Sequence, residues 1–425
     1  MRKLALLFPG QGSQYIGMGK ELLDESAAAR ELFAEASEVL GLDLQQLIFQ
    51  GSTEELTRTE NAQPALLAVS TALFHAYMDD IGVEPICLAG HSLGEFSALT
   101  SAGAIPFADA LRLVRRRGQL MQEAAAEGLG AMCAIMGSQP EQVERTCLNV
   151  SADMNRSVVI SNYNSSTQLV ISGHREAVEA AAKQLEQGGA RIAFLKVSAP
   201  FHSPLMQDAA ARFEEELAAC TYHPFRWPVL SNVTGKPYES LEQIVPYLTK
   251  QLTAPVRWDL TMRELLAAGV AVAAELGPKQ VLTQFVRTDA KSITCYPYEK
   301  TLERGQLKEE LAGEIKDEAK RRRTNNVVTR CLAAAVCTRN RNWDLEEYER
   351  GFVAPYRQVQ HLQQQLDESG EEPTKEQMQE ALEHLRQMFV TKRVPEQEQQ
   401  ERFAEILRLT GTTELFSSLL QQESH

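Results

Sequence analysis

A chain of 425 residues with 57 acidic against 43 basic side chains, a net charge of −14, lacks the basic balance of a general nucleic-acid-binding protein. Its length suffices for ~2–3 domains, and its hydrophobic fraction is ordinary for a globular protein. The seven cysteines are odd in number and none has C-x-x-C spacing, so we expect reduced thiols and no metal site. No apolar run approaches the ~18 residues of a membrane span, which predicts a cytoplasmic protein without a membrane partner.

The chain begins with an apolar run, residues 3–8, that ends in Pro-Gly-Gln-Gly. The run is too short for a signal peptide and is typical of a strand covered on both faces in a parallel sheet. The loop 9–14 that follows is either a plain strand-to-helix turn or a place where backbone N–H groups approach a ligand. Helical spacing covers 17–48, and a second helix over 65–78 is predicted to start at Pro64, where the missing N–H costs nothing.

Residues 86–97 are the stretch around which the sequence is organised. A short apolar strand, 86–89, runs into Gly90-His91-Ser92-Leu93-Gly94, and an amphipathic helix follows from Glu95. A bare G-x-S-x-G also occurs as an ordinary glycine-rich turn, but the strand before it and the helix after it are the context of a nucleophile elbow. We therefore expect Ser92 to be an exposed nucleophile beside the free N–H groups of a helix N-terminus.

The next part of the chain changes character. A helix over 107–124 carries four arginines, of which Arg116 and Arg117 point ~100° apart, so that one of them can leave the solvent side. Residues 126–198 then follow the order β-α-β-β-α-β, which predicts an inserted ferredoxin-like subdomain. Its expected elements are strands at 131–136, 157–162, 168–173 and 191–197 and helices at 139–149 and 175–187.

The chain then returns to the large domain through a rigid loop. His202 lies between Pro200 and Pro204, and although a lone histidine is more often structural, this one is set in a rigid loop after a strand. A helix is expected over 205–219, a loop over 251–258 and a helix over 258–268. Strands are expected at 228–232, 270–276 and 294–298.

From about residue 301 the composition shifts. Charged residues make up 41 of the last 125 positions, against 59 of the first 300, and no strand pattern is visible. We predict an all-α extension with helices at 306–322, 343–367, 374–390 and 395–422 and an apolar helix at 328–337. The run Lys320-Arg321-Arg322-Arg323 is either a solvated helix end or a docking patch for an acidic partner.

Eight short motifs then occur in one order: Phe8-Pro9-Gly10-Gln11-Gly12-Ser13-Gln14, Gln63-Pro64-Ala65, Gly90-His91-Ser92-Leu93-Gly94-Glu95, Arg117-Gly118-x-x-Met121-Gln122, Asn162-Tyr163-Asn164, Phe201-His202-Ser203-x-Leu205-Met206, Ser231-Asn232-Val233 and Pro255-Val256-x-Trp258. With these motifs, residues 1–300 resemble malonyl-CoA:acyl-carrier-protein transacylases and the acyltransferase domains of polyketide synthases. The resemblance implies an α/β fold with a hydrolase-like parallel-sheet core (1–125 and 199–300), a ferredoxin-like subdomain (126–198) and, outside the resemblance, the helical extension (301–425).

The resemblance also implies roles for individual residues. They are Ser92 as acylated nucleophile, His202 as general base, the N–H groups of Gln11 and Leu93 as oxyanion hole, Arg117 as partner of the malonyl carboxylate, the main-chain carbonyl of Gln251 as orienter of the histidine, and Gln63, His91, Asn162 and Phe201 as pocket residues. The implied reaction moves malonyl from malonyl-CoA to the phosphopantetheine of an acyl carrier protein, with no bound cofactor. A bulky Phe201 predicts malonyl over methylmalonyl.

One position departs from the family pattern, because Gly277-Pro278-Lys279 stands where Gly-Pro-Gly is usual. We expect little effect on the chemistry there and some effect on carrier-protein contacts. The extension favours a free-standing enzyme that serves a polyketide synthase in trans. A fatty-acid-synthesis transacylase, an acyl hydrolase and a non-catalytic interaction protein remain alternatives, and Arg117 argues against the hydrolase.

Overall fold

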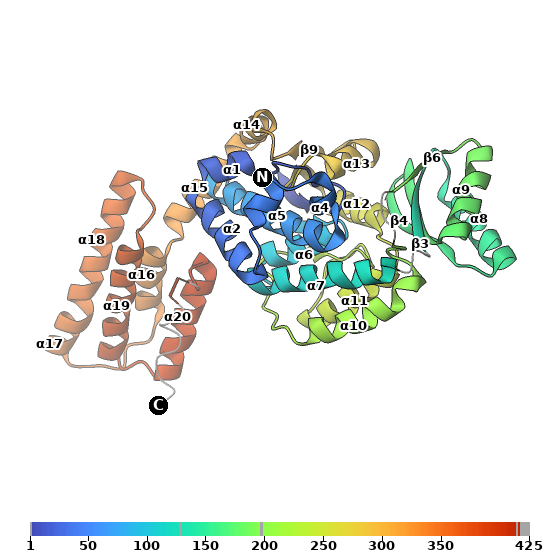
Figure 1. Ribbon diagram of the computed structural model, residues 1–425. Coiled ribbons are helices and arrows are strands. Elements are labelled where there is room, and N and C mark those ends of the chain that lie inside the picture. Colours follow the sequence, from blue (N-terminus) through green and yellow to red (C-terminus); the bar gives the residue numbers. More distant parts are fainter. Residues whose placement is uncertain (1, 127–129, 196–198, 414, 417–425) are drawn as a thin grey trace. The chain divides into compact units, whose positions relative to one another are not determined.

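The computed structural model describes residues 2–126, 130–195, 199–413 and 415–416 (Figure 1). The chain divides into two compact units, residues 1–314 and 315–425. The first unit extends beyond residue 300 because the helix α14 (Thr301–Glu310) packs on the strand β9 (Thr294–Pro297), and because the Arg2 backbone N–H donates to Glu314 at 2.8 Å.

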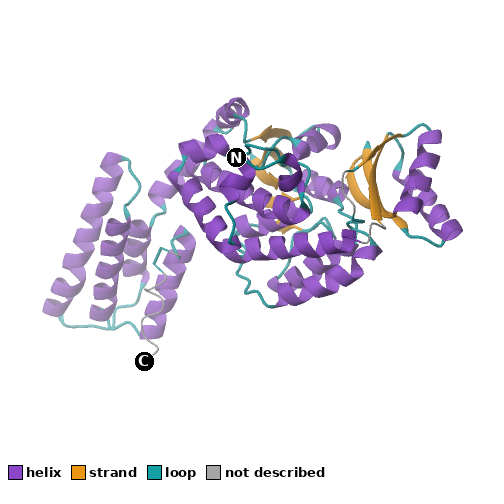
Figure 2. Ribbon diagram, viewed as in Figure 1, coloured by secondary structure: helices purple, strands orange, loops and turns teal. Residues whose placement is uncertain are grey.

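The first unit is built on a parallel sheet in the order β7-β2-β1-β8-β9, with helices on both sides (Figure 2). Its other strands are β1 (Lys3–Phe8), β2 (Cys87–Gly90), β7 (Val229–Leu230) and β8 (Val270–Glu275). All but the first residue of β1 are buried, as a strand covered on both faces requires. The predicted α/β fold with a parallel sheet is confirmed.

Most of the predicted helices are present, but the stretch 17–48 is divided. It forms α1 (Lys20–Glu25), α2 (Ala27–Leu40) and α3 (Leu44–Phe49), because Gly41 takes a left-handed conformation (φ 63°) that ends α2. The remaining helices of the large part are α4 (Thr53–Thr57), α5 (Thr59–Asp80), α6 (Leu93–Ser101), α7 (Phe107–Ala126), η1 (Pro204–Met206), α10 (Gln207–Ala218), η2 (Leu241–Gln243), α11 (Ile244–Thr253), α12 (Trp258–Ala267) and α13 (Val281–Asp289).

The expected start of a helix at Pro64 is wrong. Helix α5 begins five residues earlier, at Thr59, so Pro64 lies inside it. Because proline lacks an N–H, the carbonyl of Glu60 loses its helical partner. The Arg115 guanidinium of α7 donates to that carbonyl at 2.9 Å, so the tertiary contact replaces the missing bond.

The expected loop at 251–258 is also partly wrong, because its first residues close the helix α11. Ile244, Leu248 and Leu252 are buried at helical spacing, so the signal for this helix was present in the sequence. Gln251, a residue of the candidate site, therefore lies in the last turn of a helix and not in a loop.

The antiparallel sheet of the small subdomain has the order β4-β5-β3-β6, and α8 and α9 cover one of its faces (Figure 1). Its elements are β3 (Gly130–Met136), α8 (Pro140–Met154), β4 (Val158–Ser165), β5 (Gln168–His174), α9 (Arg175–Gln187) and β6 (Arg191–Phe194). This order is that of the predicted ferredoxin-like arrangement, although residues 196–197 of the expected last strand lie outside the described residues. The backbones of Ser161 and Tyr163 bond to Val256 at 2.9 Å and so join β4 to the large part.

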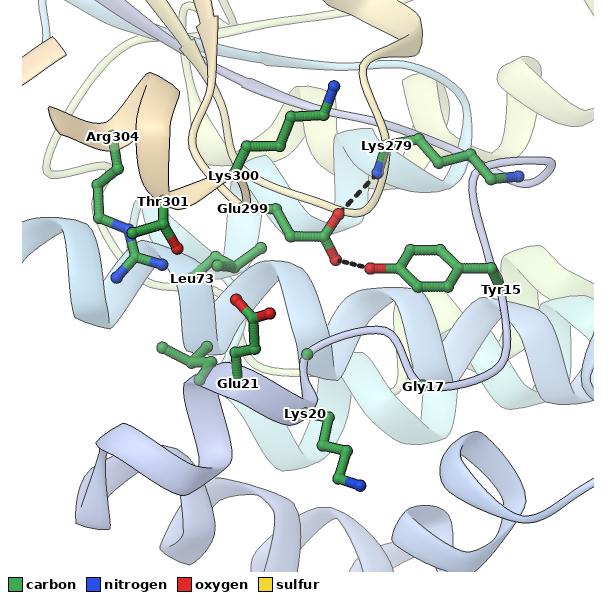
Figure 3. A pocket seen from close by; sticks show the side chains of 12 residues that line it. Tyr15, Gly17, Lys20, Glu21, Leu73, Lys279, Glu299, Lys300, Thr301 and Arg304 are labelled. Carbon is green, nitrogen blue, oxygen red and sulfur yellow. Dashed lines mark hydrogen bonds between the residues drawn. The ribbon is translucent and has the colours of Figure 1, made fainter. Parts of the chain in front are cut away.

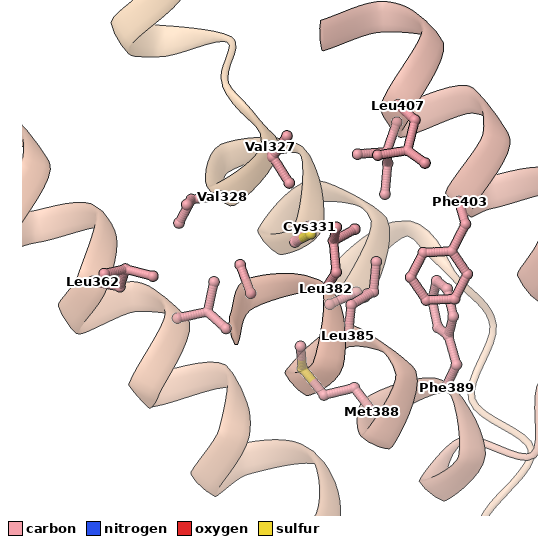
Figure 4. Packing of buried hydrophobic residues seen from close by; sticks show 14 of the residues in the cluster. Val327, Val328, Cys331, Leu362, Leu382, Leu385, Met388, Phe389, Phe403 and Leu407 are labelled. Atoms are coloured by element: carbon pink, nitrogen blue, oxygen red, sulfur yellow. The ribbon is translucent and has the colours of Figure 1, made fainter. Parts of the chain in front are cut away.

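The second unit is all-α, as predicted, and has its own apolar core (Figure 4). It contains α16 (Val327–Cys337), α17 (Leu345–Tyr348), the π-helical turn η3 (Glu349–Val353), α18 (Ala354–Ser369), α19 (Lys375–Thr391) and α20 (Glu396–Thr410), and α15 (Ala312–Thr324) leads into it. The helix expected to reach 422 ends at Thr410, because Gly411 is left-handed, and 417–422 lie outside the described residues. The side chains of Arg322 and Arg323, in the expected docking patch, are likewise not described.

A buried lysine closes one end of this core. The Lys392 ammonium group donates to the carbonyls of Ala335 and Thr338, at 2.6 and 2.8 Å, and lies 4.5 Å from the Phe352 ring centre. The side chain is 4% exposed. It therefore binds carbonyls at the C-terminal end of α16, which the helix itself leaves without partners.

Candidate functional site

Ser92 stands on a strained turn between β2 and α6. Its φ of 52° and ψ of −105° are unfavourable for a residue with a side chain, and such strain persists only where the surroundings enforce it. Part of that enforcement is close backbone packing: a Cβ on Gly94 would lie 2.0 Å from the carbonyl oxygen of Phe8. The serine is thereby held above the end of the parallel sheet.

A hydrogen-bonded chain runs from Ser92 through His202 to Gln251. The Ser92 Oγ lies 2.8 Å from His202 Nε2, and His202 Nδ1 lies 2.6 Å from the main-chain carbonyl of Gln251. A carbonyl only accepts hydrogen bonds, so Nδ1 carries the proton and Nε2 is the acceptor for the serine hydroxyl. The carbonyl is available because its helical partner four residues on would be Pro255, which has no N–H.

The environment of His202 favours the neutral imidazole. Burial and then the positive charge of Arg117 lower its pKa to about 3, while the bond to Gln251 opposes the shift. No carboxylate is bonded to the ring in the described structure; its second partner is the neutral carbonyl. The side chain is thus a hydrogen-bond acceptor toward Ser92 at neutral pH.

Arg117 lies on α7 and is 1% exposed. One terminal nitrogen, Nη1, donates to Gln63 Oε1 at 2.9 Å, and the other, Nη2, donates to Gln251 Oε1 at 2.8 Å and to Ser92 Oγ at 3.1 Å. Its Nε is buried without a partner among the described residues. Burial lowers the pKa of the guanidinium to about 10, with Glu95 opposing, so the group is cationic at neutral pH.

This arrangement leaves the guanidinium with unused binding capacity. An arginine has five N–H donors, and three are engaged in the described structure, one of them to the serine itself. Its other partners among the described residues are neutral amide oxygens, and none is a carboxylate. A carboxylate on a group attached to Ser92 would therefore find both charge and donors within reach.

The loop after β1 lies against the elbow. A Cβ on Gly10 would lie 2.3 Å from the carbonyl oxygen of His91, so the two backbones are in direct contact. Among the described residues, the N–H groups of Gln11 and Leu93 have no hydrogen-bond partner, and Leu93 is the first residue of α6. The Gln11 side chain is held at 3.3 Å from Thr59 Oγ1.

The other predicted pocket residues lie outside this network. His91 Nε2 bonds to Asn164 Oδ1 at 2.8 Å and so links the elbow to the small subdomain. Asn162 accepts from the Ser161 hydroxyl at 2.7 Å, and no hydrogen bond joins its side chain to Ser92 among the described residues. Phe201 is buried directly before His202. Asn164, in the same motif as Asn162, is thus the residue that meets the site.

Two residues near Ser92 had no role in the sequence analysis, although both lie in quoted motifs. The amide of Asn232 accepts from the Ser92 N–H and donates to the Gly90 carbonyl, both at 2.6 Å, and so clamps the elbow from both sides. Glu95, on α6, is fully buried behind Gln251. Asn232 meets Ser92, and Glu95 meets Gln251, only through tertiary packing, so the motifs alone could have indicated them.

A pocket of about 620 Å³ lies elsewhere, between residues 15–22 and 299–304 (Figure 3). None of Ser92, His202 and Arg117 lines it. The Tyr15 hydroxyl and the Lys279 N–H donate to Glu299 there, and the Lys279 ammonium reaches the Gly12 carbonyl at 3.0 Å. The departure from the family pattern at Lys279 therefore touches the loop that carries Gln11.

In the described part of the chain, no group of three or more His, Cys, Asp or Glu side chains is arranged to hold a metal ion. None of the helices in the same ranges is both long and apolar enough to cross a membrane.

Comparisons of the whole chain with known proteins agree on one family. The family model of the acyl transferase domain matches residues 5–337. A malonyl CoA-acyl carrier protein transacylase of Bacillus subtilis is 38% identical over 94% of this chain and 99% of its own length. The enzyme of the same name from Escherichia coli is 43% identical over 69% of this chain and 95% of its own length. The B. subtilis match therefore includes most of the helical extension.

Solved structures that superpose on this chain are malonyl transacylases as well. The malonyl-CoA:acyl carrier protein transacylase of Xanthomonas oryzae superposes with a TM-score of 0.70 at 40% identity, over 72% of this chain and 98% of that one. A malonyl-transacylase solved in complex with a type II PKS acyl-carrier protein superposes with a TM-score of 0.69 at 41% identity, over 71% of this chain and 97% of that one.

Proposed function

Because the chain belongs to the family of malonyl-CoA:acyl-carrier-protein transacylases, we propose that it moves the malonyl group from malonyl-CoA to the phosphopantetheine thiol of an acyl carrier protein through an ester on Ser92. One observation carries the proposal: a single hydroxyl is bonded both to a neutral histidine, at 2.8 Å, and to an arginine without a carboxylate partner, at 3.1 Å. The bond to the histidine makes the hydroxyl a nucleophile, and the nearby arginine suits an acyl group that ends in a carboxylate.

In the first half-reaction, His202 Nε2 takes the Ser92 proton as Oγ bonds to the thioester carbon. The N–H groups of Gln11 and Leu93 are proposed to receive the oxyanion, each such donor being worth ~3–4 kcal/mol. When the tetrahedral intermediate collapses, the C–S bond breaks and His202 returns its proton to the departing CoA sulfur. The products are malonyl-Ser92 and CoA.

In the second half-reaction the roles repeat with the carrier protein. His202 takes the proton of the phosphopantetheine thiol, the sulfur attacks the Ser92 ester, and the C–O bond breaks. The proton then passes to Ser92 Oγ, which restores the free enzyme. The steps use side chains, backbone N–H groups and substrate groups, and the phosphopantetheine arrives on the carrier protein.

Arg117 is proposed to bind the malonyl carboxylate throughout. Its fixed fork presents two donors in one plane, which suits a carboxylate better than the single ammonium group of a lysine does. An acyl hydrolase that releases neutral chains has no use for a buried cation beside its serine, so the hydrolase alternative is not favoured. Phe201, buried next to His202, is proposed to crowd an α-methyl group and so to exclude methylmalonyl.

We also propose that residues 1–125 and 199–300 carry the chemistry, that 126–198 form one wall of the site, and that the extension directs the enzyme to a polyketide synthase in trans. The E. coli match covers 69% of this chain and the B. subtilis match 94%, with 99% of that relative's own length, so a relative of similar length shares the extension. Support for a polyketide partner is the similarity to the malonyl-transacylase solved with a type II PKS acyl-carrier protein. Loading of carrier proteins by the full chain and by a chain ending at residue 314, the end of the first compact unit, tests it. Equal rates with every carrier protein would contradict the proposed role of the extension.

The core proposal is tested by mass spectrometry of the intact protein after brief exposure to malonyl-CoA, methylmalonyl-CoA or acetyl-CoA. We expect a malonyl adduct that Ser92→Ala abolishes and that passes to an added holo carrier protein. Release of free acid without transfer would instead establish a hydrolase. Equal adduct rates with methylmalonyl-CoA would contradict the role of Phe201.

A further inference from the structure

A buried carboxylate lies directly behind the site and has no part in the reaction described above. Glu95, on α6, has no measurable exposure to solvent. Its Oε1 accepts from the Tyr238 hydroxyl at 2.5 Å, and its Oε2 accepts from the Gln251 side-chain amide at 2.6 Å and from the Asn232 N–H at 3.2 Å. Three donors converge on it, which is the arrangement that a buried carboxylate needs.

The bond to Gln251 determines how that amide is turned. A glutamine amide has a donor end and an acceptor end, and a carboxylate can meet only the donor end. Gln251 Nε2 therefore faces Glu95, and also donates to the Ser92 carbonyl at 3.0 Å. The acceptor end, Oε1, is left to face Arg117, whose Nη2 donates to it at 2.8 Å.

The opposite orientation of the amide would be unfavourable at both ends. Its oxygen would meet the carboxylate of Glu95, and its NH₂ group would meet the guanidinium of Arg117, so that donors would face each other between buried side chains. Arg117 would then keep only Gln63 and Ser92 as partners. The main-chain carbonyl of Gln251, which bonds to His202, would be unaffected, because the end of α11 holds it.

We propose that Glu95 is a specificity-determining positioning residue: acting through the side-chain amide of Gln251, it holds the Arg117 guanidinium in the orientation that binds a carboxylated acyl group. The inference rests on the proposed function of Arg117. It predicts that Glu95 serves the choice between malonyl and a neutral acyl group, and not the reactivity of Ser92 toward acyl-CoA in general.

The substitution Glu95→Gln tests this, because an amide can offer either end to Gln251 and so removes the constraint without changing the shape. The measurement is kcat/KM for acylation of Ser92 by malonyl-CoA and by acetyl-CoA, followed by intact mass at pH 8. That pH is chosen because burial raises the pKa of the Glu95 carboxyl to about 7. We expect the malonyl-to-acetyl ratio to fall about tenfold, as for the loss of one well-placed hydrogen bond, with acetylation within twofold of wild type.

Tyr238→Phe is the matched control, since it removes another donor to the same carboxylate and leaves the bond to Gln251 intact. We expect it to preserve the ratio. Gln251→Leu removes the amide itself and should lower the ratio as Glu95→Gln does, and the double variant should fall no further, because the two residues act in series. Gln251→Leu also provides the test if Glu95→Gln does not fold.

An equal loss with both acyl-CoA substrates, or an unchanged ratio in Glu95→Gln, would overturn the inference. Additive losses in the double variant would do the same. Arg117→Ala, measured alongside, separates this failure from a failure of the proposed function. If Arg117→Ala lowers the ratio and Glu95→Gln does not, only the role of Glu95 is wrong; if Arg117→Ala leaves the ratio unchanged, the assignment of Arg117 falls and the role of Glu95 falls with it.

Discussion

Ser92 is expected to stay reactive well below neutral pH, because His202 stays neutral there. Burial and the charge of Arg117 both disfavour the imidazolium and lower the pKa of His202 to about 3. The base therefore does not titrate in the range where an exposed histidine does. The perturbation that tests this reasoning is a change of pH, combined with the removal of the nearby charge in Arg117→Met.

The expected effect of pH on the rate follows from comparing the pKa of an unperturbed histidine with that of His202. A histidine with an unperturbed pKa near 6.5 is only ~3% neutral at pH 5, which would slow a reaction that needs the neutral form ~30-fold. With a pKa of about 3, nearly all of His202 is neutral at pH 5. In Arg117→Met the burial remains but the repulsion is gone, so the pKa should rise and the rate at pH 5 should fall relative to that at pH 8.

The assay is the rate of sulfonylation of Ser92 by phenylmethanesulfonyl fluoride, followed by intact mass between pH 5 and 8. This probe has no carboxylate, so it reports the state of His202 and not the binding of malonyl. Arg116→Met is the control for charge, because Arg116 pairs with Glu216 at 3.0 Å on the outer face of the same helix. A wild-type rate that falls with an apparent pKa near 6.5 would refute the reasoning.

The lowered pKa of His202 also makes the folding stability depend on pH. Because the pKa of His202 is lower in the folded than in the unfolded protein, the unfolded protein binds more protons between pH 3 and 6.5. The contribution of His202 to stability is therefore complete above pH 6.5 and is lost as the pH falls toward 3. Circular dichroism at each pH shows whether the protein is still folded when the rate is measured.

Three further substitutions test the supports of the site and of the helical unit. Asn232→Ala removes both hydrogen bonds that hold the elbow, so the rate of malonylation of Ser92 should fall at least tenfold, and ~1–3 kcal/mol of stability should be lost because two buried backbone groups lose their partner. A rate within twofold of wild type would show that these bonds are dispensable. Gly94→Ala should abolish acylation or yield no folded protein, because the added Cβ would lie 2.0 Å from the Phe8 carbonyl oxygen. Intact mass and circular dichroism measure the two outcomes, and normal activity would contradict the close packing. Lys392→Met should lower the free energy of unfolding of the helical unit by ~1–3 kcal/mol in denaturant titrations, while Ser92 is still malonylated at the wild-type rate. An unchanged unfolding midpoint would mean that the carbonyls of α16 do not need the ammonium group of Lys392.

Local sequence was sufficient for the architecture of the first unit. Mostly apolar runs of four to seven residues, each followed by a glycine-rich turn or a helix, predicted the parallel sheet, because a strand buried on both faces is largely apolar. The order of strands and helices in 126–198 likewise predicted the subdomain, since alternation and helical spacing are local properties. Local rules were weaker where a distant residue compensates for an unfavourable one, as Arg115 does for Pro64 inside α5.

The candidate site residues could also be identified from local patterns, because the spacing around Ser92 and the motifs near Arg117 and His202 are visible along the chain. How these residues act together depends on the folded structure. Gln251 shows this best: its backbone carbonyl meets His202 because Pro255 leaves it free, and its side chain meets Arg117 because Glu95, 156 residues away, fixes its orientation. Hydrogen bonds between residues so far apart depend on how helices α6, α7 and α11 pack, and packing geometry cannot be derived from the local pattern of any one of them.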